Sequence, residues 1–263
     1  MTQSRRSDGA CGLELSAVSA VFAAGGGCTG VSLRVAAGEC VAVVGASGCG
    51  KTTLLRIAAG LLAPQTGKAQ CIDAAGQPLP LASARISVCF QDPRLLPWRR
   101  ALGNVELPLA LAGEARAERR SRASAALATV GLQEAAAKRP HQLSGGMRMR
   151  VGLARAMVTD PQILLMDEPC GALDAISRRD INLELARLRQ QTGTTMLLVT
   201  HAIDEAVMLA DRVAVMGGSP GTLWEVIEIP PSLHESDAAN GPAFARLCVT
   251  IHEALVRVRQ GAP

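Results

Sequence analysis

The stretch Gly45-Ala46-Ser47-Gly48-Cys49-Gly50-Lys51-Thr52 decides the fold of this chain. It fits G-x-x-x-x-G-K-[ST], a loop whose glycines let successive backbone N–H groups curl around a phosphate. The apolar run 39–44 before it predicts a buried strand, and residues 53–59 after it predict an amphipathic helix, whose N-terminus also attracts anions. The alternative is a glycine-rich turn that binds nothing. The flanking strand and helix favour a phosphate loop, with Lys51 beside the β- and γ-phosphates and Thr52 beside Mg²⁺.

The composition favours one large domain, or one domain with a subdomain. The chain has 263 residues, of which 48% are apolar, and a net charge of +4 from 27 basic and 23 acidic residues. This weak charge, with only 2% aromatic residues, disfavours a nucleic-acid-binding protein. The eight cysteines form no C-x-x-C pair, which disfavours a zinc site or a disulfide framework and favours a reducing cytosol. No run of 18 apolar residues is present, so no transmembrane helix is expected.

Periodicity predicts the remaining elements. Strands are expected at 13–21, 31–35, 67–72, 86–90, 163–166, 196–199, 212–216 and 223–229, and helices at 104–112, 114–130, 133–138, 147–157, 175–191 and 243–258. The first two strands alternate apolar and polar residues, as antiparallel strands do, whereas the apolar strands between helices predict a mostly parallel α/β sheet.

The same pattern predicts the domain organisation. Residues 1–11 are expected to form a disordered tail, residues 12–230 one nucleotide-binding domain, and residues 231–263 a C-terminal helical extension. The segment from about 92 to 158 carries no strand signal, so we expect a helical subdomain inserted into the α/β core.

Two acids, Asp167 and Glu168, follow the apolar strand 163–166. Ligands of open α/β sheets lie at the carboxyl ends of the strands, so both acids are expected beside the phosphate loop. There Asp167 would hold Mg²⁺ through water as the acidic partner of Thr52, and Glu168 would orient or deprotonate the attacking water. An ordinary strand-to-loop transition also places acids here; the phosphate loop favours the functional interpretation.

A second anion site is predicted at Leu143-Ser144-Gly145-Gly146-Met147, where a serine and two glycines begin a helix. A plain helix N-cap is the alternative. Since one loop of the chain already holds the phosphates, a second set of donors is most useful to nucleotide bound by another subunit.

With these motifs in order, the chain resembles the ATP-binding subunits of ATP-binding-cassette (ABC) transporters over about residues 13–230. The resemblance rests on the phosphate loop, the Q-loop residue Gln91, the signature 143–147, the acids Asp167 and Glu168, the D-loop Gly171-Ala172-Leu173-Asp174 and the switch histidine His201. The stretches 90–98, 169–174 and 217–221 resemble the importer branch for nitrate, sulfonates and taurine.

The resemblance implies a P-loop NTPase fold: an ABC-type nucleotide-binding domain with a mostly parallel core sheet, an antiparallel β subdomain and an inserted α-helical subdomain. It also implies that two chains enclose two ATP molecules. ATP would be bound by Phe22, Gly45, Ala46, Ser47, Gly48, Cys49, Gly50, Lys51, Thr52 and Thr53, and across the dimer by Leu143, Ser144, Gly145, Gly146 and Met147. Glu168, His201 and Gln91 would be catalytic, Thr52, Gln91 and Asp167 would serve Mg²⁺, and Asp174 would connect the two sites.

Some positions depart from the family pattern. Phe22 stands where the adenine-stacking residue is commonly tyrosine, Cys170 replaces a usual phenylalanine, and Trp224 is unusual in its strand. Met149 stands where the signature helix commonly has glutamine, and it is the departure expected to affect contacts with nucleotide across the dimer.

In function, the resemblance implies the ATP-hydrolysing, energy-coupling subunit of an import system for a small anion or sulfonate-like solute, at the cytoplasmic face of a bacterial inner membrane. Its partners would be a second copy or a related ATPase, a membrane permease and an extracytoplasmic solute-binding protein, with no nucleic acid. Nitrate, sulfonates, taurine and pyrimidine or riboflavin precursors all remain open as cargo. The alternative is an ABC-type ATPase of DNA repair, chromosome organisation or translation, which the single cassette and its short helical insertion disfavour. A scaffold with an inactive site is disfavoured because every core residue is present.

Overall fold

Apolar strands form the centre of the fold. The computed structural model describes residues 11–171, 173–234 and 241–260. Its parallel strands are β9 (Arg212–Gly218), β3 (Cys40–Gly45), β8 (Thr195–Thr200), β7 (Ile163–Asp167) and β6 (Ile86–Cys89), neighbours in that order. Every residue of β3 and β8 is buried, as expected for strands covered on both faces. Because these strands are parallel, Gly45, Asp167 and Thr200 end at one edge of the sheet.

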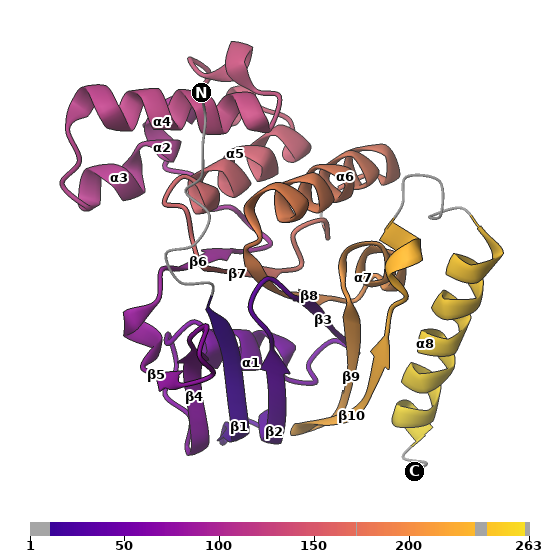
Figure 1. Ribbon diagram of the computed structural model, residues 1–263. Coiled ribbons are helices and arrows are strands. Elements are labelled where there is room, and N and C mark those ends of the chain that lie inside the picture. The colour runs from indigo at the N-terminus through magenta and orange to yellow at the C-terminus, as the bar shows by residue number, and fades with distance from the viewer. Residues whose placement is uncertain (1–10, 172, 235–240, 261–263) are drawn as a thin grey trace.

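An antiparallel half continues the same sheet. It contains β1 (Gly12–Val21), β2 (Gly27–Val35), β4 (Thr66–Ile72), the two-residue β5 (Pro78–Leu79) and β10 (Gly221–Glu228). β10 pairs with β9 along its length and with β2 at the single pair Gly221 and Cys28. The ten strands therefore follow the order β5-β4-β1-β2-β10-β9-β3-β8-β7-β6 (Figure 1).

Two apolar clusters cover the two faces of the parallel strands. In β3, Val41 and Val43 pack with α1 (Lys51–Ala58) and the antiparallel strands, whereas Ala42 and Val44 face the other cluster. This alternation follows from the period of two residues in a strand. Helix α1 is thus enclosed by both halves of the sheet, and its N-terminus is fixed at the edge where β3 ends.

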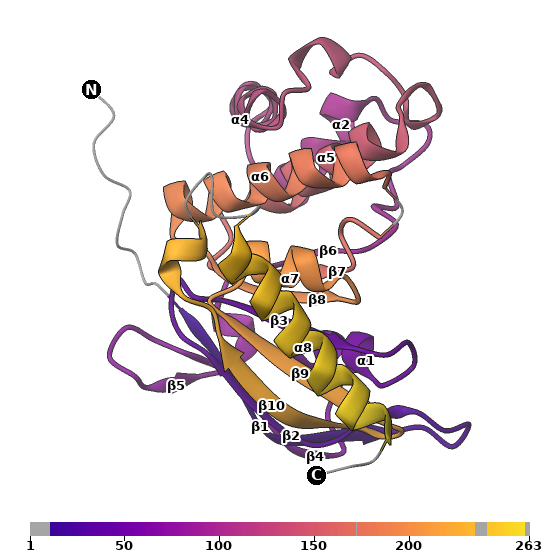
Figure 2. The same ribbon diagram turned by 90° about the vertical axis from the view of Figure 1, so that its right-hand side faces the viewer.

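The remaining helices cover the second face. Between β6 and β7 the chain forms α2 (Ala101–Val105), α3 (Leu107–Leu111), α4 (Arg116–Thr129) and α5 (Gly145–Met157), which stand apart from the strands β1, β2 and β4 in both views (Figures 1 and 2). They are followed by α6 (Ala175–Thr192), α7 (Ile203–Leu209) and α8 (Pro242–Gln260). Figure 2 shows α8 lying along β9 and β10. None of the helices in the described ranges is both long and apolar enough to span a bilayer.

Most predicted elements are present, and the differences have physical reasons. The helix expected at 104–112 is divided at Glu106, since Pro108 has no N–H to donate to Asn104. The helix expected at 133–138 is wrong: only a 3₁₀ turn, Gln133–Ala135, forms there. The strand expected to end at Phe90 ends at Cys89, and α7 and β5 were not predicted.

The expected tail needs a correction at its last residue. Residues 1–10 lie outside the described part of the chain. Cys11, however, is buried, and its carbonyl accepts a hydrogen bond of 2.7 Å from the Thr195 hydroxyl. The packed fold therefore already includes residue 11.

Candidate active site

The phosphate loop, residues 45–52, connects β3 to α1 as predicted. The side chain of Lys51 is buried at the first turn of α1, and its Nζ donates to the carbonyl oxygens of Gly45 and Ala46, both at 2.9 Å. These bonds hold the ammonium group against the loop backbone. A buried ammonium with only carbonyl partners has no countercharge in these contacts, so the loop suits an anionic ligand.

Two glycines of the loop are required by close packing. Gly50 has φ +90°, and a Cβ there would lie 2.1 Å from the carbonyl oxygen of Gly27, the first residue of β2. A Cβ at Gly45 would lie 2.4 Å from the carbonyl oxygen of Met216 in β9. The β1–β2 hairpin and the β9–β10 hairpin therefore both pack closely against the phosphate loop. The sequence predicted glycines for the approach of phosphate, and the structure adds this second reason.

The tip of β7 lies next to the start of α1. Thr52 Oγ1 donates to Asp167 Oδ1 at 3.2 Å, so two of the three residues predicted to serve Mg²⁺ are neighbours. Burial raises the pKa of Asp167, the bond from Thr52 opposes this shift, and the charge of Glu168 adds to it. The residues that the structure describes hold no group of three or more His, Cys, Asp or Glu placed to bind a metal.

Glu168, His201 and Gln91 lie together beyond the same strand ends. Glu168 has φ +47°, and its N–H donates to the carbonyl of Val199 at 2.7 Å, which fixes the unusual turn after β7. Its Oε2 lies 3.2 Å from His201 Nδ1. A Cβ at Gly171 would be 3.0 Å from Gln91 Nε2 and 3.3 Å from Glu168 Oε2, so that glycine leaves room for both side chains. The three predicted catalytic residues are thus brought to one place.

Phe22 begins the turn between β1 and β2 and is 45% exposed. The strand that follows this turn contacts the phosphate loop, since Gly27, the first residue of β2, packs against Gly50. The structure therefore places Phe22, partly exposed, on the hairpin that packs against the phosphate loop.

The signature 143–147 lies on the helical layer, away from the phosphate loop of its own chain (Figure 1). Ser144 is the N-cap of α5, and its Oγ accepts a 3.2 Å bond from Met147 N–H. Ser144 and Gly145 are exposed, whereas Leu143 is buried and anchors the turn. The serine and the first glycine of the signature are therefore accessible at the surface of the chain.

Two further predicted positions can be placed. Asp174 is exposed directly before α6, and its carbonyl accepts a 2.9 Å bond from Arg178 N–H; Ala172 of the D-loop lies outside the described residues. Met149 is buried, with its sulfur 3.8 Å from Cys89 Sγ. It packs into the core of its own chain, and its effect on contacts across the dimer stays a prediction.

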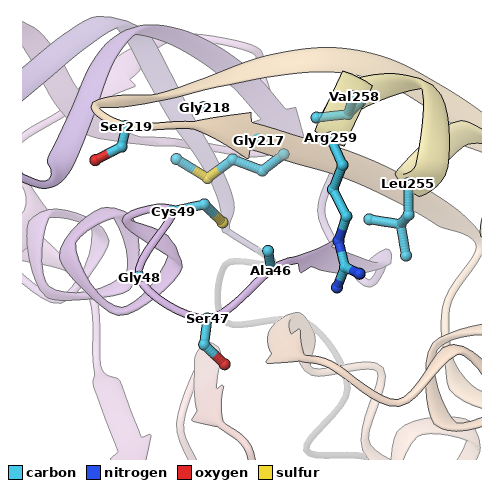
Figure 3. A pocket seen from close by; sticks show the side chains of 11 residues that line it. Ala46, Ser47, Gly48, Cys49, Gly217, Gly218, Ser219, Leu255, Val258 and Arg259 are labelled. Atoms are coloured by element: carbon cyan, nitrogen blue, oxygen red, sulfur yellow. The ribbon is translucent and has the colours of Figure 1, made fainter. Parts of the chain in front are cut away.

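Two features near the site were not predicted from the sequence. One is a set of buried polar side chains around Glu205, a residue for which no helix or strand was predicted. The other is a cavity of about 210 Å³ between the phosphate loop, the β9–β10 turn and α8. Figure 3 shows the Arg259 side chain extending from α8 toward Ala46. A helix about 200 residues away in sequence carries no local signal that it reaches this loop.

Comparison with known protein sequences identifies relatives of this chain. The family described as ABC transporter matches residues 28–171. The taurine import ATP-binding protein TauB of Pseudomonas aeruginosa is 48% identical over 193 residues, 73% of this chain and 72% of the relative. The aliphatic sulfonates import ATP-binding protein SsuB of Ralstonia nicotianae is 48% identical over 218 residues, 83% of this chain and 72% of the relative.

Solved structures agree with this relationship. The dimeric structure of MJ0796, a bacterial ABC transporter cassette, has a TM-score of 0.73 and 31% identity, and the match covers 83% of this chain and 99% of that one. A post-hydrolysis dimer of the same cassette, bound to ADP and Pi, has a TM-score of 0.72 with the same identity and coverage. The predicted fold class and family resemblance are confirmed, and the chain belongs to the ABC transporter family.

Proposed function

We propose that this chain is the ATP-hydrolysing, energy-coupling subunit of an importer for sulfonate-like solutes. One observation carries the catalytic part of the proposal: Glu168 Oε2 lies 3.2 Å from His201 Nδ1, beside the Thr52–Asp167 pair at the same edge of the sheet. A phosphate loop, a polar hydroxyl–carboxylate pair and a carboxylate–histidine pair are together what in-line attack of water on a triphosphate needs.

ATP binding is assigned to the phosphate loop and the β1–β2 turn. The backbone N–H groups of residues 45–53 would surround the phosphates, and Lys51 would exchange its carbonyl contacts for phosphate oxygens. Phe22 would stack on adenine from the attached turn.

Magnesium is assigned to Thr52, Gln91 and Asp167, with Asp167 acting through water. The donor set fits this ion, because Mg²⁺ in nucleotide sites usually takes one or two protein oxygens and completes its shell with water and phosphate. When bound, the ion would neutralise charge that develops on the phosphates.

In hydrolysis, Glu168 would accept a proton from water or orient it, and His201 would hold Glu168 and contact the γ-phosphate. Gln91 would contact the same water, since its amide nitrogen lies near Glu168 across Gly171. Catalysis would come mainly from positioning and from electrostatic stabilisation.

The outward-facing signature supports a dimer in which each chain completes the site of the other. Ser144 and Gly145 are exposed and distant from their own phosphate loop, so their N–H groups are available to nucleotide held by a second copy. Asp174 would connect the two sites. A permease in the membrane and an extracytoplasmic solute-binding protein would complete the system, with this chain at the inner face of a bacterial membrane.

The choice of cargo class is supported by the relatives, whose names specify import of taurine and of aliphatic sulfonates. Both solutes are sulfonates. Cargo selection itself would reside in the permease and the solute-binding protein.

A phosphate-release assay on the purified chain tests the catalytic assignment. Glu168→Gln should bind ATP as tightly as the wild type and hydrolyse it at least about 100-fold more slowly, because the carboxylate that acts on water is lost. Glu184→Gln is the matched control and should retain its rate, since Glu184 is a half-buried acid of α6 that pairs with Arg150 of α5. Normal turnover by Glu168→Gln would refute the assignment. Loss of sulfonate uptake in cells lacking the chain tests the transport part separately.

A further inference from the structure

Four buried polar side chains lie on or beside the segments that carry Glu168 and His201. They have no part in the chemistry proposed above. They are Thr200 at the end of β8, Glu205 on α7, Cys170 after β7 and Asn182 on α6, and each is at most 3% exposed. We call them the Glu205 network. Burying a carboxylate among helices is costly, so its presence needs a reason beyond packing.

On one side, the network frames His201. The Thr200 hydroxyl donates to Glu205 Oε2, and its oxygen accepts a 3.0 Å bond from Ala202 N–H. His201 is the residue between these two anchors. Glu205 therefore fixes the hydroxyl of Thr200, and Thr200 fixes the backbone turn that carries the histidine.

On the other side, the network reaches the segment that carries Glu168. The Cys170 thiol donates to Asn182 Oδ1 at 3.3 Å, which ties residue 170 to α6. Burial raises the pKa of Cys170 far above its usual value, and the nearby charge of Glu205 adds to the shift, so the thiol stays a donor. Cys170 is two residues from Glu168 and directly precedes the D-loop.

The Glu205 carboxylate is only partly satisfied. Its Oε1 is buried and has no hydrogen-bond partner among the described residues. An unpaired buried oxygen costs stability, whereas an apolar side chain in a purely structural role would avoid this cost. The unpaired oxygen is consistent with a role of Glu205 in holding neighbouring residues in position.

We propose that Glu205 is a positioning residue for ATP hydrolysis. Through Thr200 it holds His201. Beside it lies Cys170, which is bonded to Asn182, so that the segment after β7 that carries Glu168 and helix α6 stay in a fixed position relative to that histidine. The 3.2 Å separation of Glu168 and His201 depends on this frame. The inference rests on the proposed function, since it assigns a role to residues that support the same catalytic pair.

The test uses variants of the full chain that differ in one group. Thr200→Val removes the hydroxyl with little change of shape, and Thr200→Ser restores it. Glu205→Leu removes the acceptor, and Glu205→Gln keeps one. The measurements are kcat and KM for ATP by phosphate release, together with the melting temperature. Glu184→Leu, at a residue of α6 that pairs with Arg150 of α5 and has no contact with the Glu205 network among the hydrogen bonds and ion pairs described above, serves as the control.

Thr200→Val and Glu205→Leu should lower kcat by about 10-fold to 100-fold with KM within about twofold, because a small misplacement of a catalytic group affects the transition state more than binding. Thr200→Ser and Glu205→Gln should stay within about threefold of the wild-type kcat, and Glu184→Leu should match it. If Glu205→Leu does not fold, the Thr200→Val and Thr200→Ser pair decides the question.

A normal kcat in Thr200→Val would overturn the inference, and so would a loss of kcat that Thr200→Ser fails to restore. A fall in activity that only follows the fraction of folded protein would also assign the network a structural role. Normal hydrolysis by Glu168→Gln would instead overturn the proposed function, so the two failures are distinguishable.

Discussion

Single residues at this site are constrained by neighbours that are distant in sequence. Gly50 is an example, because its left-handed conformation alone favours glycine, and the carbonyl of Gly27 also occupies the space where a side chain would begin. Gly131 has a similar positive φ of 67° but has open space where a Cβ would lie. Substitutions at Gly50 and Gly131 therefore separate the energetic cost of the backbone conformation from that of a steric clash.

We expect Gly131→Ala to lower the free energy of unfolding by roughly 1 kcal/mol, the usual cost of a left-handed non-glycine residue. Gly50→Ala should cost at least about 3 kcal/mol, because the clash adds to that strain, and it should also abolish ATP binding. Urea denaturation and calorimetric titration with ATP measure both effects. Equal destabilisation of the two variants would show that the β1–β2 turn yields to the added methyl group.

At the scale of elements, the start of α5 has one observed role and one proposed role. Ser144 caps the helix through its bond to Met147 N–H, and the exposed turn is the proposed contact for nucleotide held by a second copy. Aspartate is as good an N-cap as serine, but it carries a negative charge. A substitution can therefore preserve the helix while removing its suitability for a phosphate.

Ser144→Asp is expected to leave the melting temperature within a few degrees of wild type and to reduce ATP hydrolysis by at least about 100-fold, since its charge repels the γ-phosphate. Circular dichroism and phosphate release measure the two properties. Ser144→Gly, which loses the side-chain cap at small cost and adds no charge, is the control. Full activity in Ser144→Asp would contradict a role for this turn in binding phosphate.

Helix α7 carries a buried acid, Glu205, whose ionisation should affect the stability of the fold. Burial raises the pKa of Glu205 above its ordinary value of 4.5, and the bond from Thr200 opposes this only in part. Between the two pKa values the unfolded chain has released the proton and the folded chain has not, so stability falls as pH rises through that window. Glu205→Gln cannot titrate and lacks this loss.

The difference in unfolding free energy, Glu205→Gln minus wild type, should therefore grow with pH from about 4.5, by at most about 1.4 kcal/mol per pH unit. Urea denaturation at a series of pH values measures it. The other buried acids are common to both proteins and cancel. Parallel stability curves would show that Glu205 ionises as easily in the folded chain as in the unfolded one.

At the scale of the whole molecule, the phosphate loop and the signature lie on different parts of one chain. The phosphate loop lies at the sheet edge, and the signature lies on the helical layer. A single copy cannot close both on one nucleotide without large rearrangement. Symmetric pairing of two copies solves the problem, since each interface then contains one loop and one signature.

Mixing two inactive variants tests this arrangement. Lys51→Ala removes nucleotide binding at one half-site, and Ser144→Asp blocks the other. Half of randomly formed dimers are mixed, and each has one complete site, so activity should recover to about a quarter of wild type. Each variant alone should stay inactive. No recovery on mixing would contradict a signature that acts on the partner's nucleotide.

The sequence by itself determined the phosphate loop, the parallel strands and the acids at the tip of β7, because these depend on local pattern: glycine spacing, apolar runs and a polar residue where a run ends. It also indicated a signature for a second subunit. It did not indicate α7, the division of α2 from α3, or the failure of a helix at 133–138.

Only the tertiary structure decided which distant residues meet. Thr52 and Asp167 are 115 positions apart, and their contact follows from the adjacency of β3, β8 and β7 in the sheet. The packing of Gly27 on Gly50 and the burial of Met149 have the same origin. Local sequence fixes the conformation of each segment, whereas strand order and the packing of buried side chains fix which segments touch, and those depend on the whole chain.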